Sequence, residues 1–339
     1  QRSVGVGYAT LGAQNFTTAT ETYNTAVGYE AGNAITTGIH NVLIGGGAGD
    51  ALTDADYNIA IGKGALSADT LGSKSIAIGE GTLAAQNFTT ATSTQNIAIG
   101  YTGGAAGDGI SDGVQNTALG YLALSAGAAS GNTAIGNEAL TANAGSNNTA
   151  LGLNAAKAAT SGNGGIFIGK DSGLTGSPGG NFTSSQNVAV FGDENIGACH
   201  IQTDWTVASD QRDKTDFTAL DIGLDFVNDL KPITYKWDKR SKYGDKTADD
   251  YDLNSITADG THKEDWLDIG FKAQEVEELE LAAGYKIADK TNLTTSLSAD
   301  GKQYGIKYNK FVPILVKALQ ELSAKNDALE ARIKTLEDS

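Results

Sequence analysis

The feature that most constrains this chain is a five-residue unit that recurs through its first half. The unit reads Asn, a β-branched residue, a small residue, an aliphatic residue and Gly, as in Asn58-Ile-Ala-Ile-Gly62. From Gly7 to Gly169 the steps between units run from 16 to 21 residues, with a mean of 18. Self-similarity at a short period is typical of solenoids, in which each turn contacts only its neighbours.

Each unit has the pattern of a short strand. Side chains alternate between faces along a strand, so the β-branched and aliphatic positions form an apolar column on one face. The small residue, usually Ala, faces the other way. A column kept small indicates a close backbone layer, either a neighbouring sheet or another chain at a symmetry axis. Gly permits a turn at positive φ, and stacked Asn side chains can bond to one another and to the turn.

We therefore predict a β-solenoid fibre domain over residues 1–195. A disordered linker is the alternative that low charge favours, but a linker has no reason to keep β-branched residues in register with Gly. Two of the longest steps contain the same insert, Ala13 to Thr20 and Ala85 to Thr92, 72 residues apart. Inserts leave a solenoid as loops. Phe16 and Phe88 are then either exposed contact residues or tucked over their own coils.

Charge and composition change sharply after residue 208. Residues 1–208 contain 14 acidic and 5 basic residues, whereas residues 209–339 contain 26 and 19. The net charge of −16 makes nucleic acid an improbable partner. A single Cys excludes a disulfide framework and a Cys-built zinc site, and we expect no cofactor and no metal. No apolar stretch is long enough to span a membrane, so we expect no membrane insertion.

The repeats resemble the left-handed parallel β-roll of trimeric autotransporter adhesin heads, whose units likewise read Asn-x-Ala-x-Gly. The resemblance covers about residues 3–170. It implies a parallel homotrimer and says little about a ligand.

The second region has the pattern of an α+β domain. An amphipathic segment runs from Leu220 to Leu230, and a strand is expected over Pro232–Trp237. Residues Trp266–Val276 have the pattern of a strand that leads into a helix. A last helix is expected from about Asn309 to the end of the chain.

The last helix carries a heptad repeat, which predicts a trimeric coiled coil over about 310–337. Asn326 takes an a position, where a buried polar residue can fix register. Two other interpretations remain open, an Asn at a frayed end and a helix that packs on its own domain. The seam consists of Val312, Leu315, Leu319, Leu322, Asn326, Leu329, Ile333 and Leu336.

Four blocks of the second region resemble the C-terminal intramolecular chaperone domain of phage endosialidases and tail fibres. The resemblance covers about residues 203–339. The blocks are Ser209–Lys214, Gly223–Trp237, Gly270–Val276 and Leu315–Leu322.

In that family the domain drives trimerisation of a β-rich fibre and then cuts itself off. The resemblance implies a junction over 196–208, a scissile bond between Ala208 and Ser209, and a chaperone domain over 209–339. It makes Ser209 the nucleophile and Lys214 its base. Asp210 and Arg212 belong to the same block and are possible supporting residues. Such a serine peptidase acts once on its own chain and is not a turnover enzyme.

The residue types suit that chemistry. A Ser hydroxyl is a weak nucleophile until a base takes its proton, and Lys can act as the base when burial disfavours its charge. Five residues apart on an α-helix, the two side chains would point about 140° apart, so they need a turn to meet. Ser209 as a helix N-cap and His200 as the base are the competing interpretations. Attack on the chain's own carbonyl or on another protomer's both remain open.

These observations favour a structural and adhesive virion protein, the distal part of a trimeric tail fibre or spike made in the host cytoplasm. Its expected partners are two further copies of itself and a host-surface receptor such as a glycan. A cellular trimeric surface adhesin that keeps the domain as a cap is the alternative. A carbohydrate-degrading spike would need paired carboxylates, and residues 1–208 offer no evident pair.

Overall fold

The computed structural model of the chain describes residues 2–101, 110–127, 129–142, 145–184, 187–246, 248 and 250–338. The chain divides into two compact units, Gln1–Asn195 (unit 1) and Ile196–Ser339 (unit 2). Each unit is described by itself.

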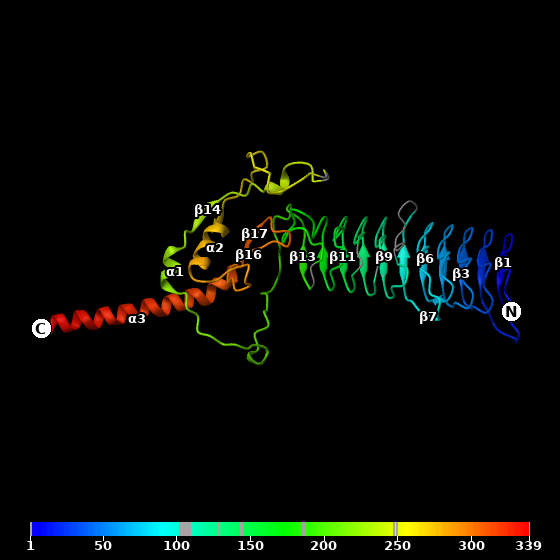
Figure 1. The fold of residues 1–339 in the computed structure, drawn as a ribbon, viewed down its shortest axis with the longest axis horizontal. Helices are drawn as coiled ribbons and strands as arrows, with labels where there is room; N and C mark the ends of the chain where they lie inside the picture. The colour runs from blue at the N-terminus through cyan, green and yellow to red at the C-terminus, as the bar shows by residue number, and fades with distance from the viewer. Residues whose placement is uncertain are drawn as a thin grey trace. The chain divides into compact units, whose positions relative to one another are not determined.

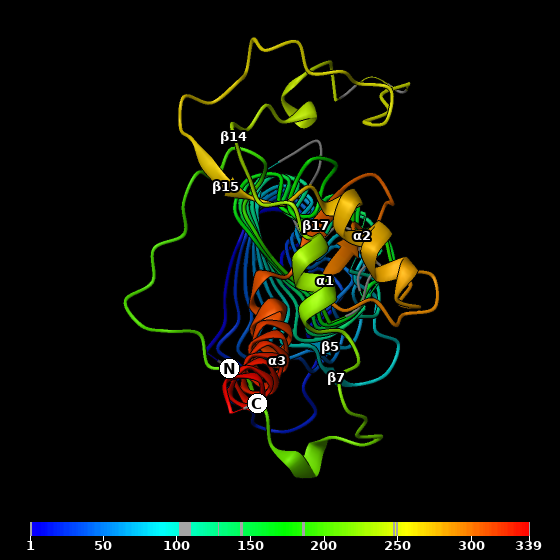
Figure 2. The same cartoon turned by 90° about the vertical axis from the view of Figure 1, so that its left-hand side faces the viewer.

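Unit 1 is a parallel β-solenoid, which confirms the predicted fold class. One three-residue strand per coil pairs with the strands of the coils before and after it (Figure 1), and the coils superimpose in the end-on view of Figure 2. Strands β5 (Gly72–Ser73) and β7 (Thr92–Ser93) form a separate small parallel pair. The main sheet contains β1 (Val4–Val6), β2 (Thr25–Val27), β3 (Val42–Ile44), β4 (Ile59–Ile61), β6 (Ile76–Ile78), β8 (Ile97–Ile99), β9 (Thr117–Leu119), β10 (Thr133–Ile135), β11 (Thr149–Leu151), β12 (Ile166–Ile168) and β13 (Ala189–Phe191).

Equivalent positions of the repeat pair with one another, and the small position faces the interior. Ala60 pairs with Ala77, and both are fully buried. Larger residues take this position in a few coils, as Leu43 and Phe167 do, and they are buried as well. The layer that keeps the column small is therefore the rest of the same coil. The interpretation that another chain at a symmetry axis lies against the Ala column is wrong.

The flanking β-branched and aliphatic side chains point out of the coil. We call this surface the outer aliphatic column. It runs along all eleven strands and is only half-covered by the chain itself. Its most exposed members are Val4, Val6, Ile44, Ile99, Leu119, Leu151, Ile166, Ile168 and Phe191. A contiguous apolar strip on an outer surface is typical of an interface.

The Gly that ends each five-residue repeat is required because the coils stack closely. Gly62 has a φ of +136°, and a Cβ added to it would lie 2.5 Å from the backbone of Gly79 in the next coil. Gly45 meets Gly62 in the same way. No other residue fits both the backbone conformation and the space.

The predicted Asn column forms a ladder of hydrogen bonds inside the solenoid. The Asn58 side chain donates from Nδ2 to the carbonyl of Gly72 at 2.9 Å and accepts from the backbone N–H of Ser75 at 2.9 Å. The backbone N–H of Asn58 in turn donates to Oδ1 of Asn41 at 2.9 Å. Each amide thus satisfies two backbone groups that the coil has removed from water.

The ladder changes at Ser75, whose side chain is too short to reach the turn. Gln86, from the second insert, enters the core instead. Its Nε2 donates to the hydroxyl of Ser75 at 2.9 Å, and its Oε1 accepts from Nδ2 of Asn96 at 2.8 Å. Nε2 also donates to the buried carboxylate of Asp69 at 2.5 Å.

The insert therefore completes the core, and its Phe88 is buried rather than an exposed contact residue. The first copy of the insert repeats the arrangement 72 residues earlier, where Gln14 donates to the hydroxyl of Ser3 at 3.3 Å. Phe16 is half-buried there. Both Phe side chains therefore fit the interpretation in which they pack over their own coils better than the one in which they are exposed contact residues.

The described part of unit 2 contains three α-helices and two small antiparallel sheets, so the α+β prediction is confirmed. The expected elements are present, with α1 and β14 shorter than the predicted segments and α2 running past Val276: α1 (Leu224–Asp229), β14 (Ile233–Tyr235), β15 (Asp268–Gly270), α2 (Ala273–Ala282) and α3 (Phe311–Glu337). The 3-10 turn η1 (Gln211–Asp213) is the turn expected between Ser209 and Lys214. The sequence patterns missed β16 (Thr295–Leu297), β17 (Tyr304–Ile306) and the 3-10 turns η2 (Arg240–Lys242) and η3 (Tyr308–Lys310). Among the described residues, no helix is sufficiently long and apolar to cross a bilayer.

The core of unit 2 joins the start of α3 to α1 and α2. Phe226, Val276, Phe311 and Ile314 are buried together. Glu321 of α3 also accepts from the backbone N–H of Leu224 at 2.7 Å, which caps α1 from another helix. A Cβ at Gly223 would lie 2.4 Å from this carboxylate, so a larger residue there would displace the cap.

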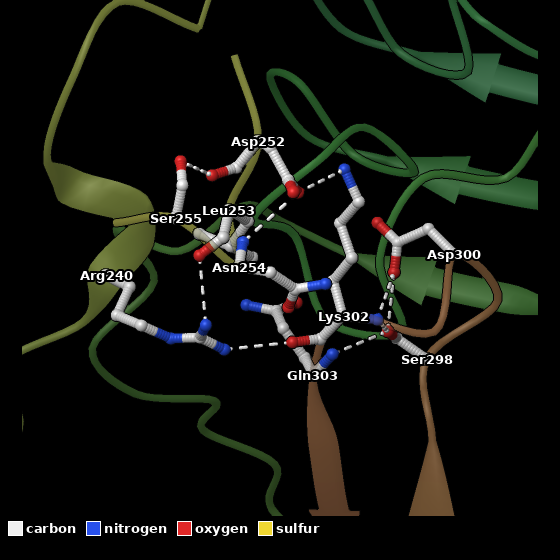
Figure 3. Close-up of polar contacts among 9 residues, drawn as sticks. All are labelled: Arg240, Asp252, Leu253, Asn254, Ser255, Ser298, Asp300, Lys302 and Gln303. Atoms are coloured by element: carbon white, nitrogen blue, oxygen red, sulfur yellow. Dashed lines mark hydrogen bonds and ion pairs between the residues drawn. The ribbon is translucent and has the colours of Figure 1, made fainter. Parts of the chain in front are cut away.

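A polar network ties the excursion after β14 to the turn between β16 and β17 (Figure 3). The Arg240 guanidinium donates to the carbonyls of Leu253 and Lys302, each at 2.9 Å, and the Lys302 ammonium pairs with Asp252 at 2.9 Å. Within the turn, the Ser298 hydroxyl accepts from the backbone N–H of Gln303 at 2.9 Å. Unit 2 thus orders a long polar segment without a large apolar core.

We expect Asn58→Ala to destabilise the solenoid by about 2–4 kcal/mol, because it leaves the N–H of Ser75 and the carbonyl of Gly72 buried without their partner. Thermal unfolding followed by circular dichroism measures the effect. Asn137→Ala is the matched control, because Asn137 is exposed. Equal melting temperatures for the two variants would contradict a stabilising ladder.

The backbone N–H of Leu224 and, next, Lys317 hold the pKa of Glu321 below its usual range. A lowered folded-state pKa stabilises the fold above the unfolded value, and the benefit disappears as pH falls through the folded value. We therefore expect Glu321→Gln to lower the melting temperature of unit 2 at pH 7, with the difference shrinking below about pH 4.5. Glu278→Gln, at an exposed site on α2, is the matched control, and melting followed by circular dichroism measures both variants.

Candidate processing site and assembly seam

The candidate scissile bond lies in an uncovered segment. Residues 195–219 are all exposed, and Figure 1 shows this part of the chain as a long irregular loop with one short turn. Ala208 and Ser209 lie near its middle. A bond in such a segment is accessible to a nucleophile and held by few contacts.

The structure brings Ser209 and Lys214 together. The one-turn helix η1 separates them, and the Lys214 ammonium donates to the Ser209 hydroxyl at 2.6 Å. A continuous α-helix would have kept these side chains apart, and the turn predicted to be necessary is present. Ser209 itself does not cap this helix, because Asp210 is the N-cap.

Asp210 and Arg212 hold the turn in shape. The Asp210 carboxylate accepts from the backbone N–H of Arg212 at 2.9 Å and receives its guanidinium at 2.6 and 3.1 Å. The Arg212 side chain and backbone keep the pKa of Asp210 below its usual range. The carboxylate is therefore ionised at neutral pH and acts as a permanent cap. Both residues act on the turn rather than on the scissile bond, so they are positioning residues.

The Ser209–Lys214 pair has the geometry of a nucleophile and its base but lies in water. Both side chains are exposed in the single chain. Removal from water favours the neutral amine, the form of Lys that can take a proton from a hydroxyl. The isolated chain thus provides the contact without the environment that would activate it.

The described part of the chain could offer other chemistry through a metal site or through another base near Ser209. It holds no group of three or more His, Cys, Asp or Glu side chains arranged to bind a metal. His200, the other candidate base, is exposed in the same segment and has no hydrogen bond to Ser209.

The predicted seam lies along the uncovered face of α3. Phe311, Ile314 and Ala318 are the helix residues buried against the rest of unit 2, and none of them belongs to the seam. All eight seam residues are exposed, and Asn326 donates to the Glu330 carboxylate at 2.9 Å. The interpretation that the seam packs on its own domain is therefore wrong, since a different face of the helix does so.

Comparison with known proteins bears on this unit alone. Residues 209–285 match the family described as chaperone of endosialidase, and the match begins at Ser209. This match includes three of the four resembling blocks, while Leu315–Leu322 lies beyond it. The chain carries an endosialidase-type chaperone region. No curated protein and no solved structure matches the chain.

Proposed function

We propose that the chain is a segment of a trimeric phage tail fibre or spike, carried on the virion and assembled in the host cytoplasm. Its chaperone region directs trimerisation and then cuts the Ala208–Ser209 bond. The observation that carries this proposal is the 2.6 Å contact between Lys214 and Ser209 at the first residue of the family match.

Two uncovered apolar surfaces support the trimer. The outer aliphatic column runs along every coil of unit 1, and the seam runs along α3 of unit 2. The side chains of the column are half-covered in the single chain, so covering them in an assembly would add to the apolar area that the interior already buries. A seam of about three heptads is marginal alone and gains from assembly elsewhere.

The cutting step uses the pair as a nucleophile and a proton shuttle. Neutral Lys214 takes the proton of Ser209, whose Oγ attacks the carbonyl carbon of Ala208. An ester forms between that carbon and Oγ as the C–N bond breaks, and the leaving nitrogen receives the proton from Lys214. Water then hydrolyses the ester. Assembly supplies the missing condition, because covering Lys214 disfavours its charged form.

Attachment to a host-surface receptor such as a glycan is part of the proposal. Tyrosines on the outside of the coils support it, because an exposed Tyr offers an apolar ring and a polar tip to a ligand. Tyr8 and Tyr29 are both exposed and stack at 5.5 Å.

We expect wild-type protein to split into pieces of 208 and 131 residues, the second beginning with Ser209, as intact-mass analysis would detect. Ser209→Ala should stay whole and still assemble. Lys214→Ala should slow cutting about 100-fold or more, because the hydroxyl loses its base. Lys214→Arg should fail too, since a guanidinium stays protonated.

Asp213→Ala is the matched control, since Asp213 is exposed in the same turn and its side chain is no part of the cap. Normal cutting by Lys214→Ala would overturn the proposed pair.

Assembly through the seam predicts that Leu319→Glu together with Leu322→Glu breaks the coiled coil and slows cutting sharply. Light scattering measures the oligomer, and intact mass measures the cut. Glu at Ala324 and Ala331 is the matched control, because these exposed positions lie on α3 outside the seam. Fast cutting by a monomeric variant would show that cutting does not depend on assembly. A variant that remains trimeric with both Glu residues would show that these Leu side chains do not form the coiled-coil interface.

A further inference from the structure

The sheet formed by β14 and β15 is incomplete. Ile233 pairs with Gly270 and Tyr235 with Asp268, and in the described part of the chain this sheet has two strands. Two strands alone are marginally stable in water, and three strands with an apolar face are usually needed. A groove of about 990 Å³ lies on this sheet, lined by Ile233, Tyr235, Trp237, Ile269, Phe271 and Tyr308.

Contacts within the single chain hold the side chains that form one wall of this groove. The rings of Tyr235 and Trp237 meet edge to face at 5.2 Å, and the Trp237 indole donates to the Asp268 carboxylate at 3.2 Å. Burial and then Asp268 raise the pKa of Tyr235 to about 12, so the phenol remains a neutral donor to that carboxylate. Ile269, in contrast, is 75% exposed. The groove is preorganised but uncovered.

A segment just before the scissile bond has the complementary pattern. Ile201, Trp205 and Val207 alternate with polar residues, so an extended chain presents them on one face. They are 50%, 74% and 71% exposed. Among the described residues, the backbone of 196–209 makes no hydrogen bond to other backbone groups.

We propose that residues 201–207 of one copy add as a third strand to the β14–β15 sheet of a second copy. Ile201, Trp205 and Val207 fill the groove, and main-chain hydrogen bonds complete the sheet, which is the strand-addition mode of recognition. Side chains two apart on a strand lie about 7 Å apart, which matches the spacing of Ile269 and Phe271 along the β15 side of the groove. Both surfaces are exposed in the single chain, and the proposed trimer supplies a second copy as the occupant.

This inference rests on the proposed self-cleavage and names how the cut segment is recognised. The bond between Ala208 and Ser209 follows directly on the docked strand. Docking therefore holds the Ala208 carbonyl in place beside Ser209 and helps to remove Lys214 from water. Cutting then depends on a neighbouring copy.

Hydrogen exchange in the full-length Ser209→Ala chain tests docking without requiring the cut. We expect the amides of 201–207 to exchange at least about tenfold more slowly in the trimer than in an unfolded peptide of that sequence, and Ile269→Asp to remove the protection. Leu267→Asp is the matched control, because Leu267 is exposed and does not line the groove. Unprotected amides, or protection that survives Ile269→Asp, would overturn the inference.

Trp205→Asp provides an independent variant should Ile269→Asp prevent assembly, with Thr206→Asp as its control on the other face of the strand. Loss of protection with Thr206→Asp but not with Trp205→Asp would also overturn the inference. If the amides are protected but wild-type chain is never cut, the docking stands and the cleavage fails.

Mixed trimers test which copy supplies the groove. Ile269→Asp chains keep the strand, and Trp205→Asp chains keep the groove. Strand docking between copies predicts that Ile269→Asp chains, nearly uncut alone, are cut at least about tenfold faster when co-assembled with Trp205→Asp chains. No rescue in mixed trimers would show docking within one chain and overturn the assignment to a second copy.

Discussion

The small interior of each coil is the constraint on which the rest of this structure depends. Because Ala60, Ala77 and their equivalents point into the coil beside buried Leu and Ile side chains, the β-branched and aliphatic side chains on either side of them alternate to the other face. They must face outward, where a single chain leaves them half-covered. The coil therefore needs an internal polar ladder for its backbone, and its outer aliphatic column is typical of a surface that a partner covers.

The sequence predicted much of the solenoid because its determinants are local and repeated. Stacked Gly and Asn positions follow from the five-residue unit, and the strand positions follow from its alternation. Which face points inward could not be decided that way, since an alternating strand has two faces. The role of Gln86 was missed for another reason. It acts on Ser75 and Asn96, which lie in other parts of the chain, and no periodicity marks such a contact.

In unit 2, too, local sequence patterns were predictable and contacts between distant segments were not. Heptad spacing predicted which face of α3 carries the seam, and the block beginning at Ser209 predicted which residues meet at the turn. Contacts between distant segments were not predictable from either pattern. Glu321 caps α1 across nearly a hundred residues, and Arg240 joins two excursions that share no sequence feature. The hairpin of β16 and β17 is too short for an alternation signal to stand out.

The proposed self-cleavage gives assembly and cutting a fixed order. Ser209 and Lys214 are five residues apart and meet through a local turn, so their contact needs nothing but the turn itself. In the proposed mechanism, activation of the hydroxyl needs a neutral amine, a form that removal from solvent favours. The chain itself leaves 195–219 exposed, so the proposal assigns the cover to an assembled neighbour. Under that proposal cutting follows assembly, and the chaperone region stays attached until the trimer has formed.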